Sequence, residues 1–255
     1  MTGTPLLRFE DVHLAFGGLR VLQSLDFDVR AGEATALIGP NGAGKTTVFN
    51  VISGVYRPQS GRVLLDGRDL AAVAPRQRIR HGIARSFQNV RLMAHLSVCE
   101  NLMVGQHVKT NGLRDLLAPF RLMGNHRWRR EAIDALAEVG LEAHADAPVG
   151  GLPYGIRKQV DLVRATLAGA SLVMLDEPAA GLNPTETNAL RLHLERLKAR
   201  GITLLVVEHD MHFIDRISDH VVVLNFGRKI AEGSLAEVRR HPEVRAAYLG
   251  IEEAA

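Results

Sequence analysis

The chain has 255 residues, enough for one large domain with a buried core, and its 46% hydrophobic and 23% charged residues are ordinary for a globular protein. Lys and Arg total 31 against 28 Asp and Glu, and this formal net charge of +3 is spread along the chain, so composition gives little reason to expect an anionic partner. The single cysteine, Cys99, excludes an intrachain disulfide and a cysteine-rich metal site, and it favours a reducing compartment.

The N-terminal sequence MTGTPLLRFEDVH lacks the basic start and the unbroken apolar stretch of a signal peptide. The longest apolar runs, such as 204–207 and 221–224, fall far short of the roughly 20 residues that a membrane-spanning helix needs. We therefore expect a cytoplasmic chain that reaches a membrane only through a partner.

The first elements read as strands. Residues 6–38 hold short apolar or alternating runs broken at Gly17-Gly18 and Ala31-Gly32, which predicts strands joined by turns. Residues 45–54 have helical spacing and end at a glycine, a turn follows, and 62–67 return as a strand. The sequence thus predicts a β-rich start that leads into a strand, loop, helix, strand unit.

The pattern changes to helix between about 98 and 170, while 109–127 stay unassigned. Strands and helices then alternate through 171–226, as in a parallel sheet. We predict an α/β fold: a core with a mainly parallel sheet, an antiparallel β subdomain near the N-terminus and an inserted α-helical subdomain. A single domain over 1–250 would place the core in 1–90 and 171–250 and the helical subdomain in about 91–170.

A phosphate-binding loop is the strongest motif. Residues 39–47 read GPNGAGKTT directly after an apolar strand and before a helix, the context that the G-x-x-x-x-G-K-[ST] motif requires. Glycines let backbone N–H groups converge on phosphate oxygens, Lys45 can bridge the terminal phosphates and the Thr46 hydroxyl can ligate Mg²⁺. A glycine-rich turn that binds nothing would not require Lys and Thr at these positions. The motif therefore predicts that the α/β core is a P-loop NTPase core.

Carboxylates follow a second apolar strand, LVMLDE, at the edge where α/β sheets place their ligands. Asp176 can hold the Mg²⁺ shell, and Glu177 can orient and deprotonate the attacking water. A strand that ends in solvated acids is the alternative, and the loop upstream makes it the weaker one. His209 ends the strand TLLVVE and should emerge at the same edge, although a lone histidine there is more often structural.

The motifs GPNGAGKTT, RSFQNV, LPYGIRKQVDLVRA, LVMLDEP, AAGLN and VVEHD occur in an order that resembles the ATP-binding cassette family over nearly the whole chain. The resemblance implies an ATPase in which Gln88 senses Mg²⁺ and water, His209 is the switch histidine and Phe16 stacks on adenine. It also implies a head-to-tail dimer with a second such ATPase. In that dimer, residues 152–156 of this chain would complete the ATP site of the second subunit.

The segments LPYG, DEPAAGLNPTET and GRKIAEGSLAEVRRHPEVRAAYLG resemble the ATP-binding subunits of bacterial branched-chain amino acid importers. This implies membrane permease subunits, a second ATPase chain and, indirectly, a periplasmic solute-binding protein, with the chain peripheral on the cytoplasmic face of the inner membrane. Urea, an amide, an aromatic acid or a lipid stays open as the solute. A soluble cassette ATPase acting on nucleic acid is less favoured, because such chains generally carry two cassettes, a long coiled-coil insertion or zinc-binding cysteines.

The signature departs from the family's usual LSGGQ. Pro153 replaces the serine, and only Leu152 and Gly155 agree. A lost hydrogen bond to the γ-phosphate, worth about 1.5–3 kcal/mol, should weaken the partner's site. We hypothesise two unequal sites, of which this chain's own loop and Glu177 form the active one.

The candidate residues fall into three groups. Those assigned to catalysis are Glu177, His209 and Gln88. Those assigned to the nucleotide are Phe16, Gly39, Pro40, Asn41, Gly42, Ala43, Gly44, Lys45, Thr46, Thr47, Tyr154 and Gly155. Those assigned to Mg²⁺ are Thr46, Gln88 and Asp176.

Overall fold

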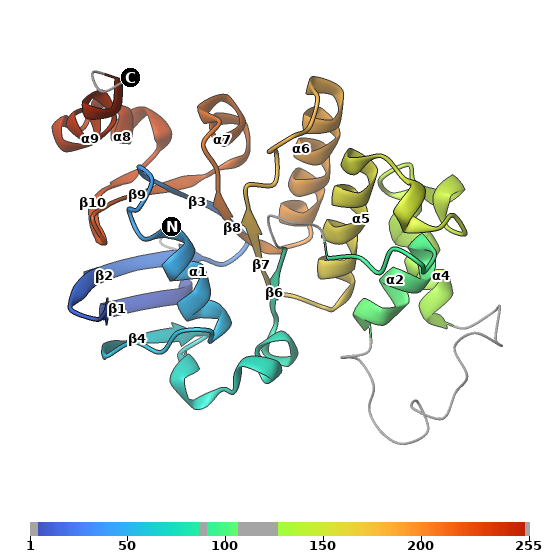
Figure 1. The fold of residues 1–255 in the computed structure, drawn as a ribbon, viewed down its shortest axis with the longest axis horizontal. Coiled ribbons are helices and arrows are strands. Elements are labelled where there is room, and N and C mark those ends of the chain that lie inside the picture. The colour runs from blue at the N-terminus through green and yellow to red at the C-terminus, as the bar shows by residue number, and fades with distance from the viewer. Residues whose placement is uncertain (1–4, 87–90, 107–126, 253–255) are drawn as a thin grey trace.

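The computed structural model describes residues 5–86, 91–106 and 127–252, and it contains two sheets (Figure 1). The smaller sheet is antiparallel, with the strand order β2-β1-β4-β5. Its strands are β1 (Pro5–Phe16), β2 (Leu19–Arg30), β4 (Ser60–Leu65) and β5 (Arg68–Asp69). Alternating apolar residues of β1 and β2 point to one face, where the rings of Phe9 and Phe27 stack 4.6 Å apart.

The larger sheet has the order β10-β9-β3-β8-β7-β6. Its strands are β3 (Ala34–Ile38), β6 (Ile83–Arg85), β7 (Leu172–Asp176), β8 (Thr203–Val207), β9 (His220–Asn225) and β10 (Arg228–Gly233). All neighbours pair in parallel except β10, which is antiparallel to β9 at the edge. Every residue of β3 and β8 is buried, because both faces of this sheet are covered.

Helix α1 (Lys45–Ser53) lies between the two sheets and joins their cores into one. Its buried residues Val48, Phe49 and Ile52 belong to a hydrophobic cluster that also contains Leu7 of β1 and Leu205 of β8. The opposite face of the large sheet packs against further helices (Figure 1). These are α6 (Pro184–Ala199), α7 (Met211–Ile217), α8 (Leu235–Arg240) and α9 (Pro242–Glu252).

The helical part contains α2 (Val98–Gly105), α4 (Arg127–Ala137) and α5 (Tyr154–Leu167). Their apolar faces enclose Trp128, which is 1% exposed. Helix α5 also faces the core, where its Leu162 packs with residues of β7 and β8. Short 3₁₀ turns cover Leu70–Ala72, Pro75–His81, Glu142–His144 and Val149–Gly151.

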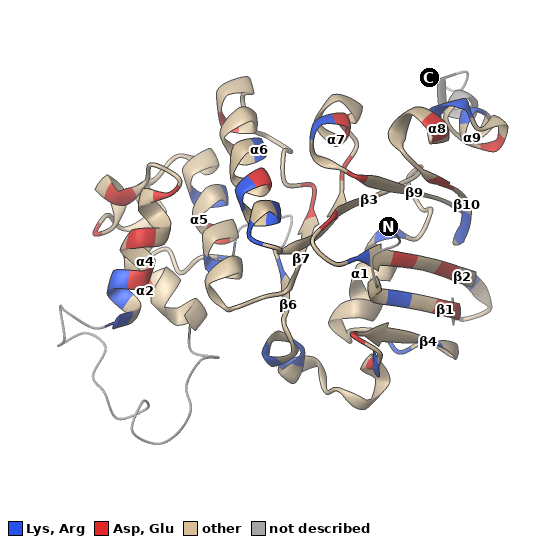
Figure 2. Ribbon diagram, turned by 180° about the vertical axis from the view of Figure 1, so that it is seen from behind, with Lys and Arg blue, Asp and Glu red and all other residues tan. Residues whose placement is uncertain are grey.

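The predicted fold class is confirmed: a mainly parallel sheet, an antiparallel sheet near the N-terminus and a helical insertion between β6 and β7. Strands β6 and β10 and helices α8 and α9 were not predicted. Among the described residues, no helix is both long enough and apolar enough to span a bilayer. Acidic and basic residues are interspersed along β1, β2, α4 and α5 (Figure 2).

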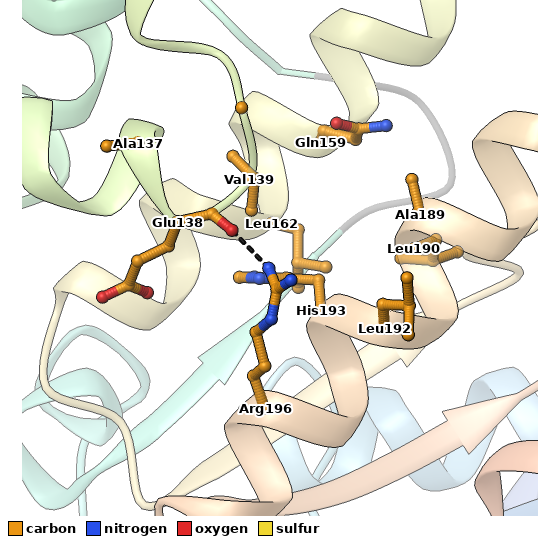
Figure 3. A pocket seen from close by; sticks show the side chains of 11 residues that line it. Ala137, Glu138, Val139, Gln159, Leu162, Ala189, Leu190, Leu192, His193 and Arg196 are labelled. Atoms are coloured by element: carbon orange, nitrogen blue, oxygen red, sulfur yellow. Dashed lines mark hydrogen bonds between the residues drawn. The ribbon is translucent and has the colours of Figure 1, made fainter.

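A hollow of about 350 Å³ separates the helical part from α6 (Figure 3). The Arg196 guanidinium of α6 donates a hydrogen bond across it to the Glu138 carbonyl, and Arg200 pairs with the Glu138 carboxylate at 2.5 Å. His193, 6% exposed, lines the same hollow, and neither ring nitrogen has a hydrogen-bond partner among the described residues. Burial lowers the pKa of His193 to about 4. Two arginines and an uncharged histidine thus border the seam between helical part and core.

Candidate active site

The loop that connects β3 to α1 contains the glycine-rich motif. Gly39, Gly42 and Gly44 have φ angles of 151°, 82° and 105°, which favour glycine. A Cβ on Gly39 would lie 2.2 Å from the Leu224 carbonyl oxygen of β9, so the loop needs a glycine there for space as well. The Gly227 N–H donates to the Ala43 carbonyl at 3.0 Å. The β9–β10 hairpin therefore supports the loop from behind.

Lys45 lies beneath this loop and is 7% exposed. Its Nζ donates to the carbonyl oxygens of Gly39 and Pro40 at 2.5 and 2.9 Å. Burial lowers the pKa of Lys45, and the nearby carboxylates of Glu177 and Asp176 oppose that shift. The ammonium is thus held by the neutral carbonyls of Gly39 and Pro40. Asn41, Gly42 and Thr46 are exposed around it, so an anion can reach the loop from solvent.

Asp176 ends β7 and pairs with an arginine that the sequence did not reveal. Arg85 of β6 approaches the Asp176 carboxylate at 3.2 Å, with both side chains nearly buried at 11% and 12% exposed. The same guanidinium donates to Asn50 Oδ1 at 2.8 Å and lies 5.4 Å from the centroid of the Phe49 ring. Arg85 therefore neutralises the carboxylate predicted to bind the metal.

The oxygen groups at this edge fit Mg²⁺ better than a metal that needs many protein ligands. No group of three or more His, Cys, Asp or Glu side chains in the described ranges could hold a metal by itself. Mg²⁺ typically takes one or two carboxylates and completes its octahedron with waters and phosphate oxygens. The Asp176 carboxylate and the Thr46 hydroxyl are donors of this type.

Glu177 and His209 come together as predicted. The His209 Nε2 atom lies 3.2 Å from Glu177 Oε1, and the two residues follow the neighbouring strands β7 and β8. Glu177 has a φ angle of 49°, in the left-handed region, and its N–H donates to the Val207 carbonyl at 2.9 Å. The sheet edge therefore presents a carboxylate and an imidazole in contact.

Glu208 sets the spacing between these two loops, and the sequence did not predict it. It is 4% exposed, and its two carboxylate oxygens accept the N–H groups of Ala179 at 2.6 Å and His209 at 3.0 Å. A buried carboxylate that accepts backbone N–H groups fixes both segments in place.

A lysine from the helical insertion also reaches this edge. Lys158 of α5 donates through Nζ to the carbonyl oxygens of Glu177 at 2.7 Å and Ala180 at 2.8 Å. Burial lowers the pKa of Lys158, and the carboxylates of Glu208 and Glu177 oppose that shift. Within the sequence it looks like an ordinary residue of a solvated helix face.

The signature residues Tyr154 and Gly155 begin α5 and pack on their own chain. A Cβ on Gly155 would lie 2.1 Å from Glu186 Oε1, and one on Gly181 would lie 3.3 Å from the Tyr154 ring. Their predicted role in the site of a second subunit stays a prediction.

The remaining predicted residues lie elsewhere or outside the described ranges. Phe16, at the end of β1, is 44% exposed and meets Tyr56 edge-on with ring centroids 4.9 Å apart. A half-exposed ring is available for stacking, as predicted for adenine, and that role also stays a prediction. Gln88 lies outside the described residues.

Comparison with known proteins agrees with this architecture. The ABC transporter family matches residues 22–180, and a family described as branched-chain amino acid ATP-binding cassette transporter matches residues 228–254. The high-affinity branched-chain amino acid transport ATP-binding protein BraF of Pseudomonas aeruginosa is 39% identical, over 96% of this chain and 98% of that protein. LivG of Salmonella typhimurium, with the same descriptive name, is 40% identical with the same coverage.

Solved structures are similar over nearly the whole chain. A nucleotide-free ATP-binding cassette from an ABC transporter has a TM-score of 0.83 and 30% identity, over 96% of this chain and 99% of that one. The ADP conformation of another ATP-binding cassette has a TM-score of 0.85 and 31% identity, over 97% and 99%.

Proposed function

Because the chain belongs to the ATP-binding cassette transporter family, we propose that it is the ATP-hydrolysing subunit of an importer for branched-chain amino acids. Two observations support this proposal. For hydrolysis, the buried Lys45 lies near enough to Asp176 and Glu177 for their charges to act on it, and His209 contacts Glu177. For the solute class, the similarity to BraF and LivG runs through the whole chain and includes residues 228–254.

The residues divide the chemistry of ATP hydrolysis among them. Lys45 and the N–H groups of the loop bind the phosphates, and Thr46 and Asp176 would hold Mg²⁺. Mg²⁺, when bound, neutralises charge on the β- and γ-phosphates. Glu177 accepts a proton from the attacking water, and His209, 3.2 Å from the Glu177 carboxylate, helps to place the reacting groups. Phe16 and Gln88 would add adenine stacking and Mg²⁺ sensing.

The partners follow from the same proposal. The chain would sit on the cytoplasmic face of the inner membrane, bound to permease subunits and to a second ATPase that receives Tyr154 and Gly155. A periplasmic solute-binding protein would act through the permeases, and nucleic acid would not be a partner.

Purification of the complex that contains this chain, followed by reconstitution in vesicles, tests the proposal. ATPase activity should rise when a binding protein loaded with leucine, isoleucine or valine is added, and it should not rise with the empty binding protein. A Lys45→Ala complex, assembled in the same way, controls for ATPase activity from other sources. Stimulation only by ribose, urea or an aromatic acid would contradict the solute class and leave the ATPase assignment intact. Failure to bind Mg-ATP would contradict both.

A further inference from the structure

The turn after β7, residues 177–181, holds Glu177 in a conformation that its own backbone does not favour. A φ angle of 49° lies in the left-handed region, where the Cβ of a non-glycine residue is crowded. Such conformations persist only where the surrounding structure imposes them, and they are enriched at functional sites. The contacts that impose this one therefore bear on how the Glu177 carboxylate is aimed.

Part of the restraint comes from the core itself. The Glu177 N–H donates to the Val207 carbonyl at 2.9 Å, and the Ala180 N–H returns to the Glu177 carbonyl at 3.2 Å. Glu208 adds a hydrogen bond from the Ala179 N–H at 2.6 Å. These bonds attach the start of the turn to β8 and its middle, at Ala179, to the Glu208 carboxylate beside His209.

The other restraint comes from the helical insertion. Lys158 donates to both carbonyls that flank the turn, those of Glu177 and Ala180, at 2.7 and 2.8 Å. Ordering a long lysine side chain and taking its charge partly out of water both cost free energy. Lys158 nevertheless turns inward, where the carboxylates of Glu208 and Glu177 supply the compensating negative charge.

The helix that carries Lys158 touches the same segment at its first turn as well. The Tyr154 ring lies next to Gly181, where an added Cβ would come within 3.3 Å of it, and the carboxylate end of the Glu186 side chain lies against Gly155. The start of α5 therefore packs against this turn and against the first turn of α6. Lys158 is the charged member of this contact, and it reaches the backbone of Glu177 itself.

We propose that Lys158 is a positioning residue for hydrolysis: it clamps the carbonyls of Glu177 and Ala180 so that the Glu177 carboxylate stays directed at His209 and the phosphate loop. The clamp also links the helix that begins with the signature segment to the catalytic turn of the same subunit. The inference rests on the proposed function, because it assigns Lys158 through Glu177.

The test compares Lys158→Met and Lys158→Arg with a matched lysine in the full-length chain. Lys198 of α6 is the control, because its Nζ also donates to a backbone carbonyl, that of Ile217 at 3.2 Å, and to Asp219 at 2.8 Å. The Asp219 carboxylate also accepts a hydrogen bond from the Ala34 N–H at the start of β3. Lys198 therefore lies at the amino ends of the parallel strands, away from Glu177 at their carboxyl ends. Mg-ATP affinity, kcat and KM, melting temperature and amide hydrogen exchange of 178–183 are measured for each variant.

Lys158→Met should lower kcat about tenfold or more, the loss expected when a charge-assisted hydrogen bond that orients a reacting group is removed. Its Mg-ATP affinity should stay within about twofold of the parent, because the 39–47 loop is untouched. Exchange at 178–183 should accelerate in Lys158→Met, and Lys158→Arg, which keeps the donors, should restore most of kcat. Lys198→Met should lower the melting temperature without changing kcat or the exchange of 178–183.

The proposal is overturned if Lys158→Met keeps kcat within about twofold of the parent, or loses no more than Lys198→Met at an equal loss of melting temperature. A Glu177→Gln chain is measured in parallel, so that the catalytic role of Glu177 and the positioning role of Lys158 are tested separately. If that variant loses turnover while Lys158→Met does not, only the role of Lys158 is wrong. If it turns over like the parent, the assignment of Glu177 and the role of Lys158 are both wrong.

Discussion

Acidification should destabilise the fold through His193, whose folded-state pKa of about 4 lies below its ordinary value of 6.5. Burial is the main cause; the Arg196 and Arg200 guanidinium groups act in the same direction, and the Glu138 carboxylate opposes them. Because the folded state binds the proton more weakly than the unfolded state, stability is complete above about pH 6.5 and falls as the pH decreases toward 4. The loss works out at about 2 kcal/mol by pH 5 and about 3 kcal/mol below pH 4.

Urea unfolding of the parent, His193→Gln and His95→Gln, followed by circular dichroism between about pH 7.5 and pH 4.5, isolates this contribution. His95 is exposed and serves as the matched control. Other groups titrate in the same range in all three proteins. The comparison is therefore between each variant and the parent in how much the unfolding free energy changes with pH. Between about pH 7.5 and pH 5 the unfolding free energy of His193→Gln should fall by about 2 kcal/mol less than that of the parent, while His95→Gln should follow the parent. Parallel curves for the parent and His193→Gln would refute the reasoning.

Further predictions concern the site and its support. Lys45→Ala should weaken ATP binding about tenfold to a hundredfold, since a charge-assisted hydrogen bond is worth about 1.5–3 kcal/mol; equilibrium binding measures this, and unchanged affinity argues against the assignment. Glu177→Gln should bind ATP normally and lose about 10²–10⁴-fold in turnover in a single-turnover assay; full activity would exclude it as the base. Gly155→Ala should displace the Glu186 carboxylate from the Asn183 N–H that it caps and lower the unfolding free energy by about 1 kcal/mol or less, whereas Gly151→Ala, with no neighbour within 4 Å, should not; equal melting curves would count against the packing. In the assembled transporter, replacing the catalytic Glu of each ATPase chain in turn should reduce activity unequally, and equal losses would refute the unequal-site hypothesis.

The parts of the site that could be predicted are those carried by local sequence. The 39–47 loop follows a strand, contains the glycines and the lysine, and leads into a helix. All the residues that determine its geometry are therefore adjacent in the sequence. The strand that ends in Asp176 and Glu177 and the strand that ends near His209 are both short apolar runs. Because parallel strands deliver their carboxyl ends to one edge, the placement of Glu177 and His209 at the same edge followed from that rule, and the structure adds their approach to 3.2 Å.

The parts that could not be predicted depend on which elements become neighbours. Arg85 is the last residue of a strand of only three residues, and it pairs with Asp176, which lies 91 positions later in the chain. Lys158 has the spacing of a solvated helix residue, and its partners become apparent only once α5 packs beside β7. Glu208 looks like one more acid at a strand end, yet it is buried on two N–H groups. The left-handed backbone of Glu177 likewise has no local signal, because it is imposed by those contacts.

The place where the helical insertion leaves the core has a mechanical consequence. The chain departs after β6, where the Ser86 N–H is bonded to the Met174 carbonyl at 2.9 Å, and it returns just before β7. The departure point is therefore one residue beyond Arg85, whose guanidinium grips Asp176. A force on the insertion, for example from a docked partner, would reach the Asp176 carboxylate through Arg85 in addition to acting through the packing of α5 on the core.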